Sequence, residues 1–285
     1  MVVGAFPLSG KIAVVTGAGS GINLAFAKQA VEQGARVVVA DLTLTDDAKA
    51  FAAAHEKSVV FAKTDVTKRA DLENTVAVAQ STFGDVPDVY IAGAGVFEPD
   101  WSSFWDDTED DGYKQVEVNV NHPMKLSRIA IRSLVRRKKP GVILVVASLA
   151  GYQGAFASPL YCATKHAVVG FVRSVADLDE LQNIKVVLVA PGYVHTPMWT
   201  ADPVKMKQFG YKPSMAVMPE EVAQGMVDLV TKAEYGGGAC LQVAVGERRT
   251  LGVWNIPAPD TDGARVSKEV LEQNYKPVLE KMRNV

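Results

Sequence analysis

Seven short apolar runs, separated by stretches with helical spacing, restrict the folds that this chain can adopt. Each run is nearly continuous in β-branched and other apolar residues; the runs cover 12–15, 37–40, 59–62, 88–92, 142–147, 186–190 and 241–245. Such runs are typical of strands that are buried on both faces, as in a parallel sheet. Because the strands alternate with helices, we predict an α/β fold, a doubly wound three-layer sandwich with a mainly parallel seven-stranded sheet.

The length and composition are those of a globular protein with one such sheet. The chain has 285 residues, of which 48% are hydrophobic and 22% charged, so a disordered chain is excluded. We expect a single domain over residues 1–285, with a core over 9–246, a substrate-covering segment over 194–218 and a C-terminal tail over 247–285. The tail is expected to be irregular around Pro257, Pro259 and Gly263. It should then form a helix from about Ser267 and pack on the domain or on a partner subunit.

Charge and residue counts disfavour several classes of function. Lysine and arginine total 30 and aspartate and glutamate total 32, so there is no overall attraction for nucleic acid. Two cysteines and four scattered histidines do not suggest a metal site. No apolar run approaches the roughly 18 residues that span a membrane, and the first residues lack a signal-peptide pattern. We therefore expect a cytoplasmic protein with no nucleic-acid and no membrane partner.

A glycine-rich segment, Thr16-Gly17-Ala18-Gly19-Ser20-Gly21-Ile22, follows the first strand and precedes a helical pattern. Glycines at this point allow a tight turn and the close approach of a pyrophosphate to backbone N–H groups. The second strand ends about 20 residues later, at Asp41. An acid there can accept hydrogen bonds from ribose hydroxyls and repels a phosphate on the ribose. Since no Arg or Lys stands at Ser20 or Leu42, we predict a Rossmann-type domain that binds NAD rather than NADP.

A second group of polar residues has the chemistry of proton transfer. Tyr161 and Lys165 have the spacing of one helix face. Ser148 ends the fifth predicted strand, and Asn119 lies at the expected bend of a helix before Pro123. A tyrosine has a pKa of about 10, so it must become more acidic to act as a base near neutrality. We expect the Lys165 ammonium and a positive nicotinamide ring to favour its phenolate form.

These motifs, in this order, resemble those of the short-chain dehydrogenase/reductase family over roughly residues 9–246. The resemblance implies that Tyr161 is the general acid/base, Lys165 lowers its pKa and holds the nicotinamide ribose, Ser148 polarises the substrate oxygen, and Asn119 holds a water of the proton relay. It also implies a homodimer or homotetramer, formed through the helices that carry Asn119 and Tyr161. The implied cofactor-binding residues are Gly17, Ser20, Gly21, Ile22, Asp41, Asp65, Val66, Ala92, Gly93, Ala94, Tyr161, Lys165, Pro191, Gly192, Val194 and Thr196.

Two positions depart from the family pattern. Asn23 replaces the usual third glycine, and Ala92-Gly93 replaces two asparagines after the fourth strand. Asparagine adds bulk where the helix packs on the strand. The hydrogen bonds that the missing amides make must therefore be replaced or absent.

The predicted substrate cover, 194–218, combines three prolines with many methionine and aromatic residues. Such side chains suit an adaptable apolar pocket, although packing between subunits would also explain them. Candidate substrate contacts are Gln153, Phe156, Tyr193, Met198 and Trp199. The segments around Tyr161 and Thr196 are similar to the branch of 15-hydroxyprostaglandin dehydrogenase and fungal polyketide-pathway alcohol dehydrogenases. We therefore expect a bulky apolar secondary alcohol or its ketone as the substrate.

Other functions remain open at the level of sequence. The same residues would serve a ketoreductase that uses NADH or NADPH, and the scaffold could host a non-redox cyclase or dehydratase. The departures at Asn23 and Ala92-Gly93 leave room for a cofactor-sensing protein without turnover. An acidic cluster over 106–111 is explained by a solvated helix start, or by a rim that disfavours anionic substrates.

Overall fold

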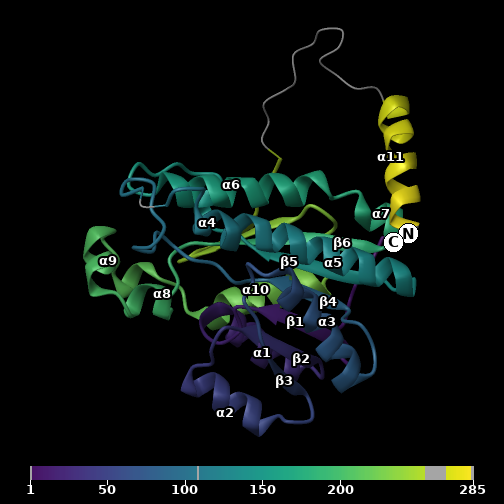
Figure 1. The fold of residues 1–285 in the computed structure, drawn as a ribbon, viewed down its shortest axis with the longest axis horizontal. Coiled ribbons are helices and arrows are strands. Elements are labelled where there is room, and N and C mark those ends of the chain that lie inside the picture. The colour runs from purple at the N-terminus through teal and green to yellow at the C-terminus, as the bar shows by residue number, and fades with distance from the viewer. Residues whose placement is uncertain (1, 108, 254–267, 284–285) are drawn as a thin grey trace.

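The computed structural model describes residues 2–107, 109–253 and 268–283. Its centre is one sheet with the strand order β3-β2-β1-β4-β5-β6-β7-β8 (Figure 1). The first seven strands are parallel, as predicted: β1 (Ile12–Thr16), β2 (Arg36–Asp41), β3 (Val59–Lys63), β4 (Val89–Ala92), β5 (Gly141–Val146), β6 (Ile184–Pro191) and β7 (Cys240–Ala244).

An eighth strand, β8 (Glu247–Thr250), pairs antiparallel with β7 at the edge of the sheet. The sheet therefore has one strand more than the seven predicted, because residues 247–250 belong to the segment predicted as the C-terminal tail. All four of its residues are exposed, so it carries no apolar pattern. Gly246, with φ of +70°, turns the chain back between the two strands.

Helices cover both faces of the sheet, which confirms the three-layer prediction (Figure 1). The residues of β1 alternate between two cores: Ala13 and Val15 enter one, Ile12 and Val14 the other. The first core includes α1 (Gly21–Glu32), α2 (Asp46–Ala54) and α10 (Pro219–Thr231); the second includes α3 (Arg69–Phe83), α5 (His122–Arg137) and α6 (Pro159–Ser174). Both faces of the strands are therefore apolar, which explains the continuous apolar runs.

Shorter helices connect or flank these layers. They are α4 (Lys114–Val116), α7 (Leu178–Gln182), α8 (Pro197–Thr200), α9 (Pro203–Gln208), a π-helix (Glu117–Asn121) and two 3₁₀ turns (Leu149–Gly151 and Pro213–Met215). The predicted substrate cover thus contains α8, α9 and one 3₁₀ turn. A parallel bridge between Val194 and Val217 closes this segment at its base.

The predicted C-terminal helix is α11 (Lys268–Arg283). Met282 is buried, and Leu279 is half-buried, against the core that contains α5. Part of the tail therefore packs on the domain, through these two side chains. The predicted irregular segment around Pro257, Pro259 and Gly263 lies outside the described residues.

Candidate active site

A cavity of about 600 Å³ follows the carboxyl edge of the sheet. Segments after β1 and β4 contribute to its wall, and the strand order reverses between these two neighbours. Doubly wound folds bind ligands at such a point. The predicted site residues that line the cavity are Gly17, Ser20, Gly21, Ile22, Asp41, Asp65, Val66, Gly93, Ala94, Ser148, Gln153, Tyr161, Lys165, Pro191, Gly192, Tyr193, Val194, Thr196, Met198 and Trp199.

The glycine-rich turn has the shape of an anion cradle. Gly17 has φ of +73°, and a Cβ there would lie 2.7 Å from Ala94 Cα. A Cβ at Gly19 would lie 2.1 Å from the Thr43 carbonyl oxygen, so neither position accepts a larger residue. The Ser20 hydroxyl makes no capping bond to α1. The first N–H groups of α1 are therefore free of a side-chain cap and fit a pyrophosphate.

Two carboxylates stand at the ends of β2 and β3. Asp41 Oδ2 accepts a hydrogen bond of 2.8 Å from the Gly19 N–H, which ties the end of β2 to the glycine turn. Asp65 accepts hydrogen bonds from the Thr67 hydroxyl and N–H, and the hydroxyl bond is the main reason that its pKa is lowered. Both acids line the cavity. Asp41 could therefore accept hydrogen bonds from a ribose, and no arginine among the described residues lines the cavity to bind a ribose phosphate.

The two departures from the family pattern lie against each other. A Cβ at Gly93 would lie 2.1 Å from Asn23 Oδ1, so the amide of Asn23 occupies the space of a side chain at position 93. Asn23 Nδ2 donates a long bond of 3.4 Å to the Gly17 carbonyl oxygen, and Asn23 Oδ1 has no partner among the described residues. Asn23 therefore links the turns after β1 and β4.

Asn119 lies within the π-helix, which leads directly into α5. Its Nδ2 donates to the Val96 carbonyl oxygen (2.9 Å) and to Thr164 Oγ1 (3.2 Å), and its Oδ1 accepts from the Val96 N–H. Its side chain is buried and does not line the cavity. Asn119 thus joins the loop after β4 to α6, the helix that carries Tyr161 and Lys165.

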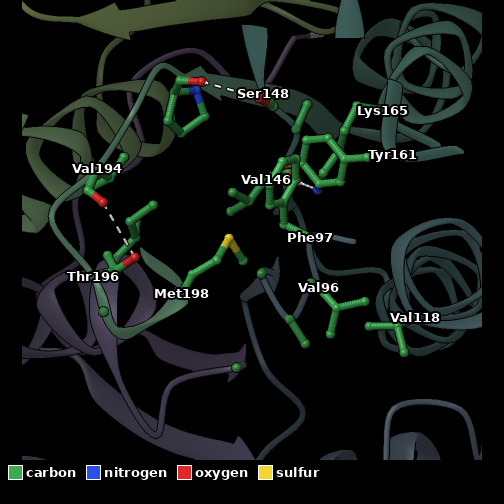
Figure 2. Close-up of a pocket in the computed structure, with 18 of the residues that line it drawn as sticks. Val96, Phe97, Val118, Val146, Ser148, Tyr161, Lys165, Val194, Thr196 and Met198 are labelled. Atoms are coloured by element: carbon green, nitrogen blue, oxygen red, sulfur yellow. Dashed lines mark hydrogen bonds between the residues drawn. The ribbon is translucent and has the colours of Figure 1, made fainter. Parts of the chain in front are cut away.

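Ser148, Tyr161 and Lys165 meet on one wall of the cavity (Figure 2). The Lys165 ammonium lies 5.5 Å from the centre of the Tyr161 ring and donates to the Val146 carbonyl oxygen at 3.0 Å. Burial raises the pKa of Tyr161 to about 12, against the effect of the Ser148 hydroxyl. Burial also lowers the pKa of Lys165 to about 8. Desolvation of the buried phenol therefore outweighs the Ser148 hydrogen bond in its effect on the pKa of Tyr161.

Aromatic side chains connect Tyr161 to the substrate cover. The Phe97 ring packs edge-on against Tyr161, with 4.7 Å between centroids, and contacts Trp199 and Phe209 at 4.9 and 4.7 Å. Tyr211 is buried and stacks on Trp199. In Figure 2, Phe97 lies beside Tyr161, and Met198 reaches toward it from the side of Thr196. The wall beside the phenol is consequently apolar.

Besides Asn119, two further predicted site residues do not line the cavity. Ala92 is buried in the last position of β4 and does not line the cavity, because its side chain belongs to the core on the α5 side. Phe156 is also absent from the cavity wall. Its side chain is 85% exposed, and its ring contacts Trp105 at the surface.

Sequence reasoning missed Phe97 and Trp101, which both line the cavity. They lie in the irregular segment between β4 and α4, where no periodic pattern indicates the direction of a side chain.

Two further findings concern a metal site and a membrane span. The described residues hold no group of three or more His, Cys, Asp or Glu side chains arranged for a metal ion. No described helix is long and apolar enough to cross a membrane.

Known proteins resemble this chain over most of its length. The family model described as short chain dehydrogenase matches residues 11–206. L-fucose dehydrogenase of Mus musculus is 32% identical over 249 residues, which are 84% of this chain and 88% of that protein. Galactitol 2-dehydrogenase of Agrobacterium fabrum is 31% identical over 207 residues (72% of this chain, 79% of that protein). The NAD(+)-linked 15-hydroxyprostaglandin dehydrogenase of Mus musculus is 27% identical over 249 residues (81% and 88%). The chain belongs to the short-chain dehydrogenase/reductase family.

Proposed function

We propose that this protein is an NAD-dependent oxidoreductase that interconverts a bulky apolar secondary alcohol and its ketone. The observation that carries the proposal is one cavity that contains both the glycine turn with Asp41 and the Ser148, Tyr161 and Lys165 side chains. On this proposal residues 1–285 act as one NAD-binding unit, and the segment 194–218 covers the substrate.

Cofactor binding would use the turns at the carboxyl edge. The N–H groups at the start of α1 would bind the pyrophosphate, and Asp41 would accept hydrogen bonds from the adenosine ribose. Val66 and Asp65 would contact the adenine, and Thr196 the nicotinamide amide. When bound, NAD would supply the hydride acceptor and a positive charge near the phenol.

The proton would move through Tyr161. In the oxidation direction the phenolate form of Tyr161 takes the proton of the substrate hydroxyl, and in the reduction direction the phenol returns it. The Ser148 hydroxyl would hold the substrate oxygen beside the phenol. Lys165 would favour the phenolate through its positive charge. Asn119 would keep α6 in register with the loop after β4, consistent with its bonds to Val96 and Thr164.

The apolar wall favours an apolar substrate. Phe97, Trp199 and Phe209 line the cavity near Tyr161. A polyol would leave several hydroxyls without partners against such a wall, and each unpaired polar group costs on the order of 1–3 kcal/mol. The named substrates of the sugar-acting relatives are therefore a poorer match than an apolar alcohol.

Turnover of the Tyr161→Phe variant tests this proposal. The purified protein is given NAD and a series of apolar secondary alcohols, and the formation of NADH is followed by absorbance. We expect Tyr161→Phe to lower kcat by at least about 100-fold, the scale of a lost general acid/base, while the Kd for NADH stays nearly unchanged. Substrate loss without NADH formation would instead indicate a dehydratase or cyclase. Turnover that survives in Tyr161→Phe would contradict the assigned role.

A further inference from the structure

The loop between β4 and α4 exposes an unusual number of aromatic side chains beside the cavity. Five phenylalanine and tryptophan side chains are counted as exposed in the described part of the chain: Phe61, Trp101, Phe104, Trp105 and Phe156. Four of them lie in this loop or in the loop before α6. Gln153, Gly154 and Ala155 of the second loop line the cavity, as Trp101 of the first loop does. The aromatic surface is therefore continuous with the cavity mouth.

Three of these four side chains already have partners. The Trp105 ring contacts Phe104 and Phe156, with centroids 5.1 and 4.8 Å apart. Trp105 Nε1 donates a hydrogen bond of 2.9 Å to the Phe156 carbonyl oxygen. These contacts join the loop between β4 and α4 to the loop before α6.

Trp101 differs from its neighbours. Its side chain lines the cavity and is 48% exposed. Within the described ranges, no ring packs against its indole and no group accepts a hydrogen bond from its Nε1. A tryptophan N–H usually finds a hydrogen-bond partner once it is buried, and tryptophan is therefore enriched at binding surfaces. Trp101 therefore offers a flat apolar face and an N–H donor to something that enters the cavity.

The path from the reacting centre leads along the same loop. Phe97, four residues before Trp101, already packs against Tyr161, Trp199 and Phe209. The Phe97 ring forms part of the wall beside the phenol, and its contacts with these three rings already occupy much of its surface. A substrate whose oxygen lies at Tyr161 can extend past Phe97 toward the mouth, where Trp101 is available.

The charges of the loop that carries Trp101 disfavour an anion. The same loop carries Asp100, Asp106, Asp107, Glu109, Asp110 and Asp111. Among the described residues that line the cavity, Lys165 is the one lysine or arginine, and its ammonium donates to the Val146 carbonyl oxygen beside Tyr161. Lys205, on the substrate cover, is engaged by Asp202 and the Phe97 carbonyl oxygen. A carboxylate or phosphate at the outer end of the substrate would thus lie near a loop rich in acids, and the described cavity wall offers it no cation besides Lys165.

We propose that Trp101 stacks on an uncharged aromatic or conjugated ring of the substrate, at the outer end of the cavity. This inference rests on the proposed function for the position of the reacting carbon, and it names the substrate class: an apolar alcohol or ketone that bears a flat, uncharged ring. Trp105 and Phe156 hold the two loops together, and Trp101 contacts the ring.

The test compares a phenyl-substituted secondary butanol with its cyclohexyl counterpart, which has a similar size but no flat ring. Binding of both compounds is measured by calorimetry, with and without NADH, and turnover with NAD is measured separately. We expect Trp101→Ala to weaken binding of the phenyl compound about threefold to tenfold, the range for an aromatic pair. The loss for the cyclohexyl compound should be at most half as large, and Trp101→Phe should restore most of the phenyl preference. A third compound, with a carboxylate on the phenyl ring, should bind about tenfold more weakly than the parent to the wild-type protein.

Phe61→Ala is the matched control, because Phe61 is an exposed aromatic residue on β3 that does not line the cavity. It should leave the phenyl preference unchanged. Equal losses for the two butanols in Trp101→Ala, or equal binding of the carboxylated compound, would overturn the inference. A Trp101-dependent phenyl preference without any NADH formation would instead support the ring subsite and overturn the proposed oxidoreductase activity. NADH formation without any effect of Trp101→Ala on the phenyl preference would support the oxidoreductase activity and overturn the ring subsite.

Discussion

Two buried lysines at opposite edges of the sheet differ in one instructive way. Lys165 lies near the carboxyl end of β5 and Lys185 near the amino end of β6, and burial lowers the pKa of each to about 8. Lys185 donates to three carbonyl oxygens, those of Gly4, Val230 and Lys232. These bonds use all the donors of an ammonium and join the N-terminal segment to the end of α10.

Lys165 has one such partner in the described chain, the Val146 carbonyl oxygen, and it lines the cavity. Its remaining donors can bind a ligand. Burial and a shifted pKa therefore do not by themselves separate a functional lysine from a structural one. Unused hydrogen-bond donors beside a cavity do distinguish the two. The candidate site is therefore at the carboxyl edge of the sheet, where Lys165 lies.

Replacement of each lysine by methionine should separate their roles, and Lys165→Met should give the largest effect on kcat. Lys165→Met removes the positive charge near Tyr161, and we expect kcat to fall at least about 100-fold. Lys185→Met should retain kcat in the folded protein, while three carbonyls lose their donor and unfolding becomes easier by roughly 1–3 kcal/mol. NADH formation and urea unfolding measure the two effects. Comparable kcat losses in both variants, at a temperature where both are folded, would remove the distinction.

Substitutions at positions 93 and 23 test whether the fit between these two residues sets the cofactor affinity of the carboxyl edge. Gly93→Ala places a Cβ within 2.1 Å of Asn23 Oδ1, so the Asn23 side chain must shift or the turns after β1 and β4 must move apart. We expect NADH to bind about tenfold more weakly, a loss of roughly 1.4 kcal/mol. Asn23→Gly in the same chain should recover most of this affinity.

Gly170→Ala is the control for that experiment, since a Cβ there has open space. It should bind NADH as the wild type does. A Gly93→Ala protein with unchanged NADH affinity would show that Asn23 has room to move and does not set the spacing of the two turns.

The smallest expected effect concerns how the free energy of unfolding changes with pH. At Lys165 the pKa is about 8 in the folded protein and 10.5 without the fold, so between these values the unfolded chain binds more protons. Stability contributed by this group must therefore rise with pH in that window. Between about pH 7.5 and 9.5, the wild type should gain roughly 1–2 kcal/mol relative to Lys165→Met in urea unfolding. A difference between the two proteins that does not change with pH would mean that Lys165 keeps its proton.

The parallel sheet was predictable because both of its faces are buried. The runs 12–15 in β1 and 186–190 in β6 are apolar at every position, and the glycine-rich turn directly follows the first of them. The β8 strand was not predictable, since Glu247, Arg248, Arg249 and Thr250 are exposed and have no apolar period. Its pairing depends on the turn at Gly246 and on a free edge of β7.

The candidate site could be predicted where local spacing fixes geometry. Tyr161 and Lys165 lie four positions apart on α6, and Asp41 ends β2, so each was found from sequence. Phe97 and Trp101 were missed because an irregular loop carries no period. The contact between Asn23 and Gly93 is also invisible in sequence, because it joins two turns that are 70 positions apart and meet only when β1 pairs with β4.

Titration of the purified protein with NADH and NADPH, followed by nucleotide fluorescence, tests the central claim most directly. If Asp41 and the glycine turn form the cofactor site, NADH should bind at least about tenfold more tightly than NADPH, a difference of roughly 1.4 kcal/mol. Asp41→Ala should reduce that preference. Tighter binding of NADPH, or no binding of either nucleotide, would contradict the account of this cavity as an NAD site.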